Sequence, residues 1–167
     1  MKRILKSLVF ILILILLIIN YRVPFLKQNG GPWSIGFGES NTFPEDISIE
    51  INGKYPLEQL KKYSDSTKFL ADPFFLKVKD TFYLFFEHKK IEDNAVIGLL
   101  TSTDGKNYNY RGTVLKENFH LSYPQIFEYK KNYYMIPESQ GSNQVLLYKA
   151  KRFPFDWKVC DTLLKNI

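Results

Sequence analysis

The stretch from Leu70 to Glu87, LADPFFLKVKDTFYLFFE, returns 51 residues later as LSYPQIFEYKKNYYMIPE, from Leu121 to Glu138. In each copy, a short apolar segment is followed by a polar turn and then by an aromatic segment that ends in Glu. Two apolar runs separated by turn-forming residues are typical of a β-hairpin. The sequence therefore predicts one hairpin that is repeated at a fixed spacing.

Each predicted hairpin is followed by two more predicted strands, at 95–101 and 107–114 and again at 144–150 and 157–163. Four strands in a repeat of about 50 residues are typical of a β-propeller blade. We predict an all-β fold with two four-stranded blades, residues 69–115 and 116–167, which form part of a propeller. Two unrelated meanders in a β-sandwich are the alternative, although sandwiches lack such long-period similarity.

The N-terminal segment contains an unbroken apolar run, LVFILILILLII, from Leu8 to Ile19, with basic residues on both sides. Together with its neighbours and Tyr21, this run reaches the length of a membrane-spanning helix. No small residues that would form a cleavage site follow it. We predict that residues 1–24 are an uncleaved signal anchor with one transmembrane helix. A cleaved signal peptide and a buried core helix are the alternatives.

The predicted orientation of this anchor follows from three basic residues at its amino end, which favour an extracytoplasmic position for the globular part. We therefore expect a single-pass membrane protein that is anchored in the lipid bilayer. Residues 25–68 are predicted to form a linker and the first propeller strands, at 33–37 and 47–51.

The net charge of +6 does not indicate nucleic-acid binding. Five of the 23 Lys and Arg residues precede residue 28, where none of the 17 acidic residues lies, so the basic excess belongs to the anchor. Cys160 is the single cysteine, which excludes an intrachain disulfide and a cysteine-based zinc site. The two histidines, His88 and His120, lack the spacing of a metal motif. We predict no metal and no cofactor.

Four segments together resemble one protein family: WSIGFGES (33–40), ADPFFLKVKDTFYLFFE (71–87), TSTDGKNYNYRG (101–112) and HLSYPQIFEYKKNYYMIPES (120–139). The family is the N-terminal five-bladed β-propeller of glucosamine inositolphosphorylceramide transferases, which is itself similar to the propellers of glycoside hydrolase families 43 and 32. The resemblance covers about residues 33–164. It implies a partial five-bladed propeller and a carbohydrate-related function. In the transferases, a separate glycosyltransferase domain follows the propeller, and the 167 residues of this chain do not include one.

The candidate catalytic residues are three carboxylic acids. By its resemblance to the Asp-Pro of family 43, Asp72 is a candidate general base; Tyr123 stands at its position in the second repeat. Glu87 and Glu138 end the second strand of each hairpin, and burial among apolar neighbours would raise the pKa of either toward that of a general acid. The alternatives are an Asp-Pro turn for Asp72 and structural hydrogen bonds for the two glutamates.

The candidate substrate-binding residues lie within the resembling segments and are Trp33, His120, Tyr123 and Ser139. In a propeller, the innermost strands of all blades line one central channel, so residues at equivalent repeat positions converge there. Aromatic residues in strands also serve as core residues, and that alternative stays open for the aromatic candidates.

These observations predict a membrane-anchored, carbohydrate-related module that binds a glycan or glycolipid or assists glycosyl transfer, without catalysis by this chain. A family 43-like glycoside hydrolase is the alternative, and the sequence leaves open whether the protein is an enzyme. Because a closed propeller needs about four to eight blades, we expect a truncated sequence, a split gene product or a further polypeptide that completes the ring.

Overall fold

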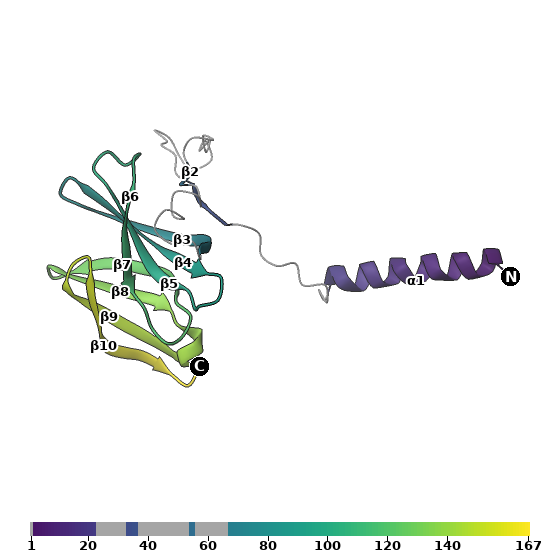
Figure 1. The fold of residues 1–167 in the computed structure, drawn as a ribbon. Coiled ribbons are helices and arrows are strands. Elements are labelled where there is room, and N and C mark those ends of the chain that lie inside the picture. Colours follow the sequence, from purple (N-terminus) through teal and green to yellow (C-terminus); the bar gives the residue numbers. More distant parts are fainter. Residues whose placement is uncertain (1, 23–32, 37–53, 56–66) are drawn as a thin grey trace. The chain divides into compact units, whose positions relative to one another are not determined.

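The computed structural model describes residues 2–22, 33–36, 54–55 and 67–167 (Figure 1). The predicted strand at 47–51 lies outside these residues. The chain divides into two units, residues 1–31 and 32–167, each of which is described by itself.

The first unit contains one helix, α1 (Lys2–Arg22), and the apolar side chains from Leu8 to Ile19 are exposed along it. The sequence predicted a transmembrane helix here, and this prediction requires correction. In the part of the chain that the structure describes, no helix is both long and apolar enough to cross a membrane.

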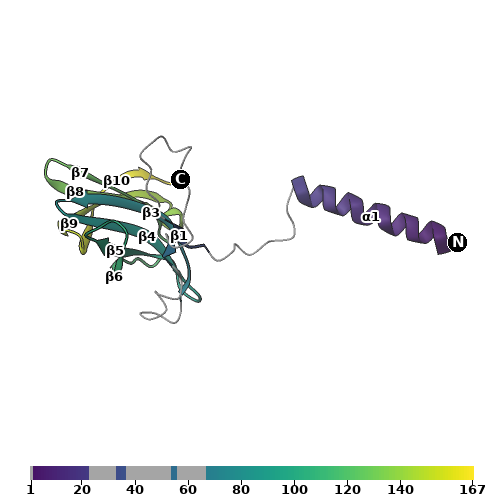
Figure 2. The same cartoon turned by 90° about the horizontal axis from the view of Figure 1, so that it is seen from above.

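The second unit contains two four-stranded antiparallel sheets, as the repeat predicts. The first sheet consists of β3 (Thr67–Val78), β4 (Thr81–Lys90), β5 (Val96–Ser102) and β6 (Asn109–Leu115) in that order. The second consists of β7 (Ser122–Tyr129), β8 (Asn132–Glu138), β9 (Gln144–Arg152) and β10 (Asp156–Lys165), with a short 3₁₀ turn, η3 (Gln140–Ser142), before β9. Each sheet is thus a blade-like meander, and Figure 2 shows both from above.

The backbone repeats with the spacing of the sequence. Ala71 pairs with Glu87 in the first hairpin, and Ser122 pairs with Glu138 in the second. In both hairpins, a β-bulge follows this pair, and the residue in the bulge has a left-handed backbone, with φ of 50° at Asp72 and 47° at Tyr123. The repeat therefore extends from the side-chain pattern to individual backbone angles.

A two-stranded fragment precedes the first sheet, formed by β1 (Ile35–Gly36) and β2 (Lys54–Tyr55). The backbone N–H of Leu70 donates to the carbonyl of Trp33, just before β1, at 3.2 Å. The N–H of Leu121 donates to the carbonyl of Ala95, just before β5, at 3.1 Å. Because these bonds match, β1 and β2 occupy the places of the third and fourth strands of a preceding blade.

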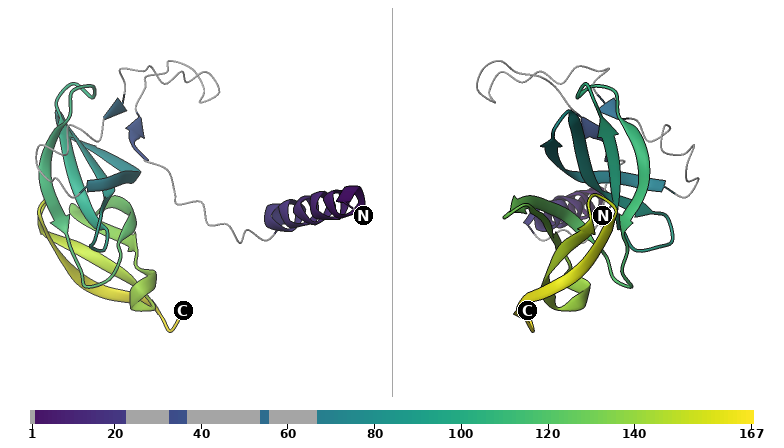
Figure 3. Two further views of the ribbon diagram at one scale, coloured as in Figure 1. Left: turned by 45° about the vertical axis from the view of Figure 1, so that its right-hand side comes forward. Right: turned by 90° about the vertical axis from the view of Figure 1, so that its left-hand side faces the viewer.

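The main hydrophobic core lies between the two sheets. The first sheet contributes Phe85, Ile97, Leu99, Val114 and Leu115, and the second contributes Leu121, Met135, Leu146, Tyr148 and Trp157. Figure 3 shows the two sheets from two further sides. Among the described residues, this core therefore lies between the two sheets and takes buried side chains from both.

A second core cluster repeats this arrangement one blade earlier. It consists of Ile35, Leu70, Leu84, Phe86 and Leu100. Leu70 and Leu84 occupy the repeat positions equivalent to Leu121 and Met135 in the main core. Ile35 occupies the position equivalent to Ile97. The next residue in β5, Gly98, must be a glycine because an added Cβ would lie 2.5 Å from the Phe86 ring.

The core between the sheets predicts the effect of a truncation in it. Phe85 is fully buried, so Phe85→Ala should lower the free energy of unfolding by about 3 kcal/mol, measured by urea titration. Phe75 on the neighbouring strand β3 is 69% exposed, so Phe75→Ala should cost less than about 1 kcal/mol. Equal losses in the two variants would contradict the assigned core.

Candidate functional site

The two β-bulges bring Asp72 and Tyr123 together at one end of the interface between the sheets. The carboxylate of Asp72 accepts a hydrogen bond from the backbone N–H of Tyr123 at 3.3 Å. The two rings on these bulged segments, Phe74 and Tyr123, also meet edge to face at 4.8 Å. Equivalent repeat positions thus converge here, as the channel geometry predicts.

Glu87 lies beneath this contact and is buried. Its Oε1 lies 3.0 Å from Nε2 of His120. Burial, together with the negative charges of Asp72 and Glu138, raises the pKa of Glu87 to about 7. Glu87 is thus buried, as the sequence analysis considered, and its role as a general acid stays a prediction.

His120 is half exposed and faces Glu87 from the segment that connects the two sheets. Its partial burial and the nearby Lys89 lower its pKa, and the carboxylates of Glu138 and Asp72 act in the opposite direction. Asp72, Glu87 and His120 therefore form one cluster of titratable side chains, in which Glu87 contacts His120 directly and the charge of Asp72 acts on both. We call these three residues the acid–histidine chain.

Glu138 lies on the second sheet, where its Oε2 accepts a hydrogen bond from the hydroxyl of Ser122 at 2.8 Å. The sequence analysis expected burial among Ile136 and Pro137, and this expectation is wrong because Glu138 is exposed. The fold turns its side chain toward Ser122 on β7, its partner in the strand register, so it remains accessible to a ligand.

Two open cavities lie beside the acid–histidine chain. One, of about 410 Å³, includes Trp33, Asp72 and Glu87 in its lining. The other, of about 650 Å³, includes His120 and Glu138. Both volumes fall in the range of small-molecule sites. The cavities are related by the repeat, since Glu87 lines one and its equivalent Glu138 lines the other.

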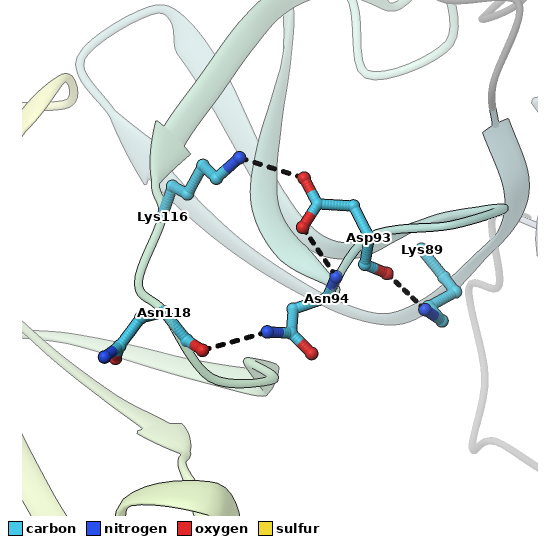
Figure 4. Close-up of polar contacts among 5 residues, drawn as sticks. All are labelled: Lys89, Asp93, Asn94, Lys116 and Asn118. Carbon is cyan, nitrogen blue, oxygen red and sulfur yellow. Dashed lines mark hydrogen bonds and ion pairs between the residues drawn. The ribbon is translucent and has the colours of Figure 1, made fainter.

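The segment that carries His120 is fixed by a loop of the first sheet (Figure 4). Asp93 forms an ion pair with Lys116 at 2.9 Å, and the side-chain amide of Asn94 donates to the carbonyl of Asn118 at 3.0 Å. Lys89 donates to the carbonyl of Asp93, which closes the cluster. These contacts, with the Leu121 backbone bond, position His120 over Glu87.

The remaining predicted site residues occupy separate positions. Trp33 is exposed at the edge of the smaller cavity. Ser139 is buried, and its hydroxyl donates to the carbonyl of Gln144 at 2.7 Å, which places it outside the acid–histidine chain. Sequence reasoning missed Ser122, although its position directly opposite Glu138 in the predicted hairpin register was a usable signal.

The part of the chain that the structure describes contains no group of three His, Cys, Asp or Glu side chains placed to hold a metal ion. This arrangement supplies hydrogen-bond donors and acceptors and the exposed aromatic faces of Trp33 and Tyr123.

Comparison with known proteins gives concordant results. Residues 55–167 match the family described as glucosamine inositolphosphorylceramide transferase 1, N-terminal. The protein glucosamine inositolphosphorylceramide transferase 1 of Arabidopsis thaliana is 36% identical over 156 residues, which cover 84% of this chain and 20% of that protein. The protein of the same name from Oryza sativa subsp. japonica is 38% identical over 171 residues, covering 89% and 23%. The chain therefore spans about a fifth of the length of these relatives.

Among solved structures, a GH43 β-1,3-galactosidase with galactodeoxynojirimycin is similar to part of the chain. The TM-score is 0.42 at 17% sequence identity, and the match covers 55% of this chain and 33% of that one.

The pKa of Glu87 predicts a pH dependence of stability. Because the folded pKa of about 7 exceeds the ordinary value of 4.5, the stability from neutral Glu87 is present below pH 4.5 and is lost as the pH rises through 7. The Glu87→Gln variant should not show this loss. Between pH 5 and pH 8, its free energy of unfolding should rise by about 2 kcal/mol relative to that of the wild type, measured by urea titration. Glu92→Gln, at an exposed position whose charge does not contribute to the pKa of Glu87, should keep the wild-type slope. Parallel profiles for wild type and Glu87→Gln would contradict the assignment.

Proposed function

Because this chain belongs to the family of glucosamine inositolphosphorylceramide transferase 1 N-terminal domains, we propose that it is part of a five-bladed propeller that binds a glycan or glycolipid and assists glycosyl transfer. One observation carries this proposal. The inner ends of the two sheets join in the acid–histidine chain, with an open cavity on each side.

The chemistry of this region suits a ligand rich in hydroxyl groups. Such a ligand needs several hydrogen-bond donors and acceptors close together, and an apolar face for its ring. Asp72 and Glu138 supply acceptors, and His120 supplies a ring nitrogen that donates or accepts. Trp33 and Tyr123 supply exposed aromatic faces.

A family 43-like hydrolase is the second candidate function, and the raised pKa of Glu87 favours it. A pKa of about 7 keeps this carboxyl group largely protonated up to neutral pH, as a general acid requires. In that mechanism, Asp72 would be the base and Glu87 the general acid. Release of nitrophenol from aryl glycosides by wild type, but not by Asp72→Asn, would establish hydrolysis.

Tryptophan fluorescence offers a direct test of glycan binding. Of the two tryptophans, Trp157 is 5% exposed in the core, whereas Trp33 is 59% exposed and lines the smaller cavity. Titration with hexose and aminohexose oligosaccharides should therefore give a saturable change that Trp33→Phe abolishes.

In the same assay, Asp72→Asn should weaken binding roughly tenfold, because a charged acceptor is lost. Asparagine tolerates the left-handed backbone at this position, so the fold should persist. Asp80→Asn, in the turn after β3, is the matched control and should bind as wild type does. Equal affinities for the two variants, or no saturable signal with any oligosaccharide, would contradict the proposal.

We also propose that α1 attaches the protein to a lipid bilayer. Its apolar side chains from Leu8 to Ile19 are exposed, and the sequence places Lys2, Arg3 and Lys6 at one end. A helix with these features binds membranes through its apolar surface and through attraction to anionic lipids.

Vesicle flotation should show this attachment. The wild-type chain should float with phosphatidylcholine vesicles, and more fully when phosphatidylserine is added. The double variant Ile13→Asp, Leu16→Asp should remain at the bottom of the gradient, because two charges in the apolar segment oppose burial in lipid. Ile91→Asp, at an exposed apolar residue of the second unit, is the control and should float. Flotation of the double variant at the wild-type level would rule out α1 as the membrane contact.

A further inference from the structure

We propose that the turns at one end of the two sheets form a surface that binds the anionic headgroups of a lipid bilayer. This surface, which we call the turn end, comprises the β3–β4, β5–β6, β7–β8 and β9–β10 turns. Figures 1 and 2 show the β3–β4 and β7–β8 turns at the same end of their sheets. The inference goes beyond the proposed attachment through α1 and rests on it in one respect, because α1 would bring the sheets close to the bilayer.

The turn end lies away from the candidate site. Asp72 precedes Lys79 in the β3–β4 turn by seven residues, which correspond to about 23 Å of extended strand. All strands in the two sheets are antiparallel in chain order, so the β5–β6 and β9–β10 turns lie at the same end as the other two. The sheets pack on each other through their faces, and their turns therefore stay open to solvent.

Positive charge is in excess at the turn end. Six exposed basic residues lie in three of its turns or next to them: Lys77, Lys79, Lys130, Lys131, Lys151 and Arg152. Three acidic residues lie at the same turns: Asp80, Glu128 and Asp156. In the β5–β6 turn, the charges of Lys106 and Asp104 cancel. The Asp104 carboxylate accepts hydrogen bonds from its own turn, for example from the backbone N–H of Asn107 at 2.8 Å.

The opposite end of the sheets has a different balance. Its described strand ends and loops contain five lysines: Lys68, Lys89, Lys90, Lys116 and Lys165. They also contain six acidic residues: Asp72, Glu87, Glu92, Asp93, Glu117 and Glu138. Basic residues thus outnumber acidic ones at the turn end alone. An anionic surface therefore attracts that end, and the acid–histidine chain points away from it.

Two exposed aromatic rings lie among the basic residues of the second sheet. Tyr129 in the β7–β8 turn is 55% exposed, and Phe155 in the β9–β10 turn is 43% exposed. The Nζ of Lys130 lies 5.1 Å from the centroid of the Tyr129 ring, and the rings of Tyr133 and Phe153 stack at 4.0 Å and join the two turns. Aromatic rings favour the membrane interface, and lysines beside them extend their charge to the headgroups. A lipid surface therefore fits better than a soluble polyanion, which offers an exposed phenylalanine no apolar phase.

The length of the chain allows α1 and the turn end to contact one bilayer. Arg22 and Trp33 are eleven residues apart, and a chain of that length spans at most about 40 Å. The backbone of Leu70 bonds to Trp33, and Lys79 lies nine residues further on, about 30 Å along the strand. In this orientation, the acid–histidine chain faces the aqueous phase and a glycan dissolved there.

A tryptophan placed at the turn end can report the contact. In the full chain, Trp33→Phe leaves the buried Trp157, and Phe155→Trp then adds an exposed ring at the turn end. Vesicles of brominated phosphatidylcholine and phosphatidylserine, at about four to one, should quench the emission of this reporter chain roughly twofold. The reason is that bromine quenches a ring that enters the lipid. Quenching should be weaker without phosphatidylserine and absent in the chain that carries Trp33→Phe alone.

Matched variants reverse two charges at either end of the sheets. In the reporter chain, Lys131→Glu together with Lys151→Glu should abolish the quenching. Lys68→Glu together with Lys165→Glu makes the same change of charge at the opposite end and should leave the quenching as it is. All four positions are exposed, so the thermal midpoint should stay that of the reporter chain.

The absence of quenching would overturn the proposal, and so would quenching that survives the turn-end pair or that both pairs abolish equally. Heparin binding that the turn-end pair abolishes, without quenching by vesicles, would reassign the surface to a soluble polyanion. Flotation of the same samples tests α1 separately. A chain that floats without quenching rejects the turn end alone, whereas quenching without flotation rejects the attachment through α1 alone.

Discussion

The packing of one sheet's apolar face against the next is the interaction on which the rest of the second unit depends. A single four-stranded meander leaves both of its faces open, and only a neighbour removes them from water. Phe85 and Met135 meet across the interface as Ile35 and Leu84 do one blade earlier. Stacking of the sheets thus stabilises the chain. Each interface between two sheets therefore fixes the positions of the side chains on the strands that form it.

The candidate site is a product of this stacking. Asp72 and Tyr123 are 51 residues apart, yet stacking aligns their bulges closely enough for a backbone hydrogen bond between them. Glu87 reaches His120 for the same reason, because one belongs to the first sheet and the other begins the second. The polar loop contacts of Asp93 and Asn94 then fix the connection, and a buried acid acquires a pKa of about 7 from its surroundings.

The sequence predicted the repeat, the strands and the buried acid because each has a local signal: alternation, turn residues and apolar neighbours. It did not predict the hydrogen bond from the Tyr123 backbone to Asp72, since side-chain direction in a β-bulge depends on a left-handed backbone angle that an Asp-Pro pair alone does not specify. The sequence analysis considered Glu138 as buried, but it is exposed. It is the last residue of its strand, so its apolar neighbours, Ile136 and Pro137, lie only before it in the chain. The sequence also predicted that α1 spans a membrane, because its central run is apolar. A span requires both sufficient length and sufficient hydropathy, and α1 does not meet this requirement.

Where the two repeats differ is as informative as where they agree. Core positions keep their apolar character, as in Leu70 and Leu121, because the interface tolerates little else. At the β-bulges the residue type differs between the two repeats, with Asp72 in the first sheet and Tyr123 at the equivalent position in the second. The backbone N–H of Tyr123 donates to the carboxylate of Asp72. A structure that is symmetric in its backbone therefore carries an asymmetric site. Since the acid–histidine chain joins the first sheet to the segment that leads into the second, its geometry depends on the packing of the two sheets.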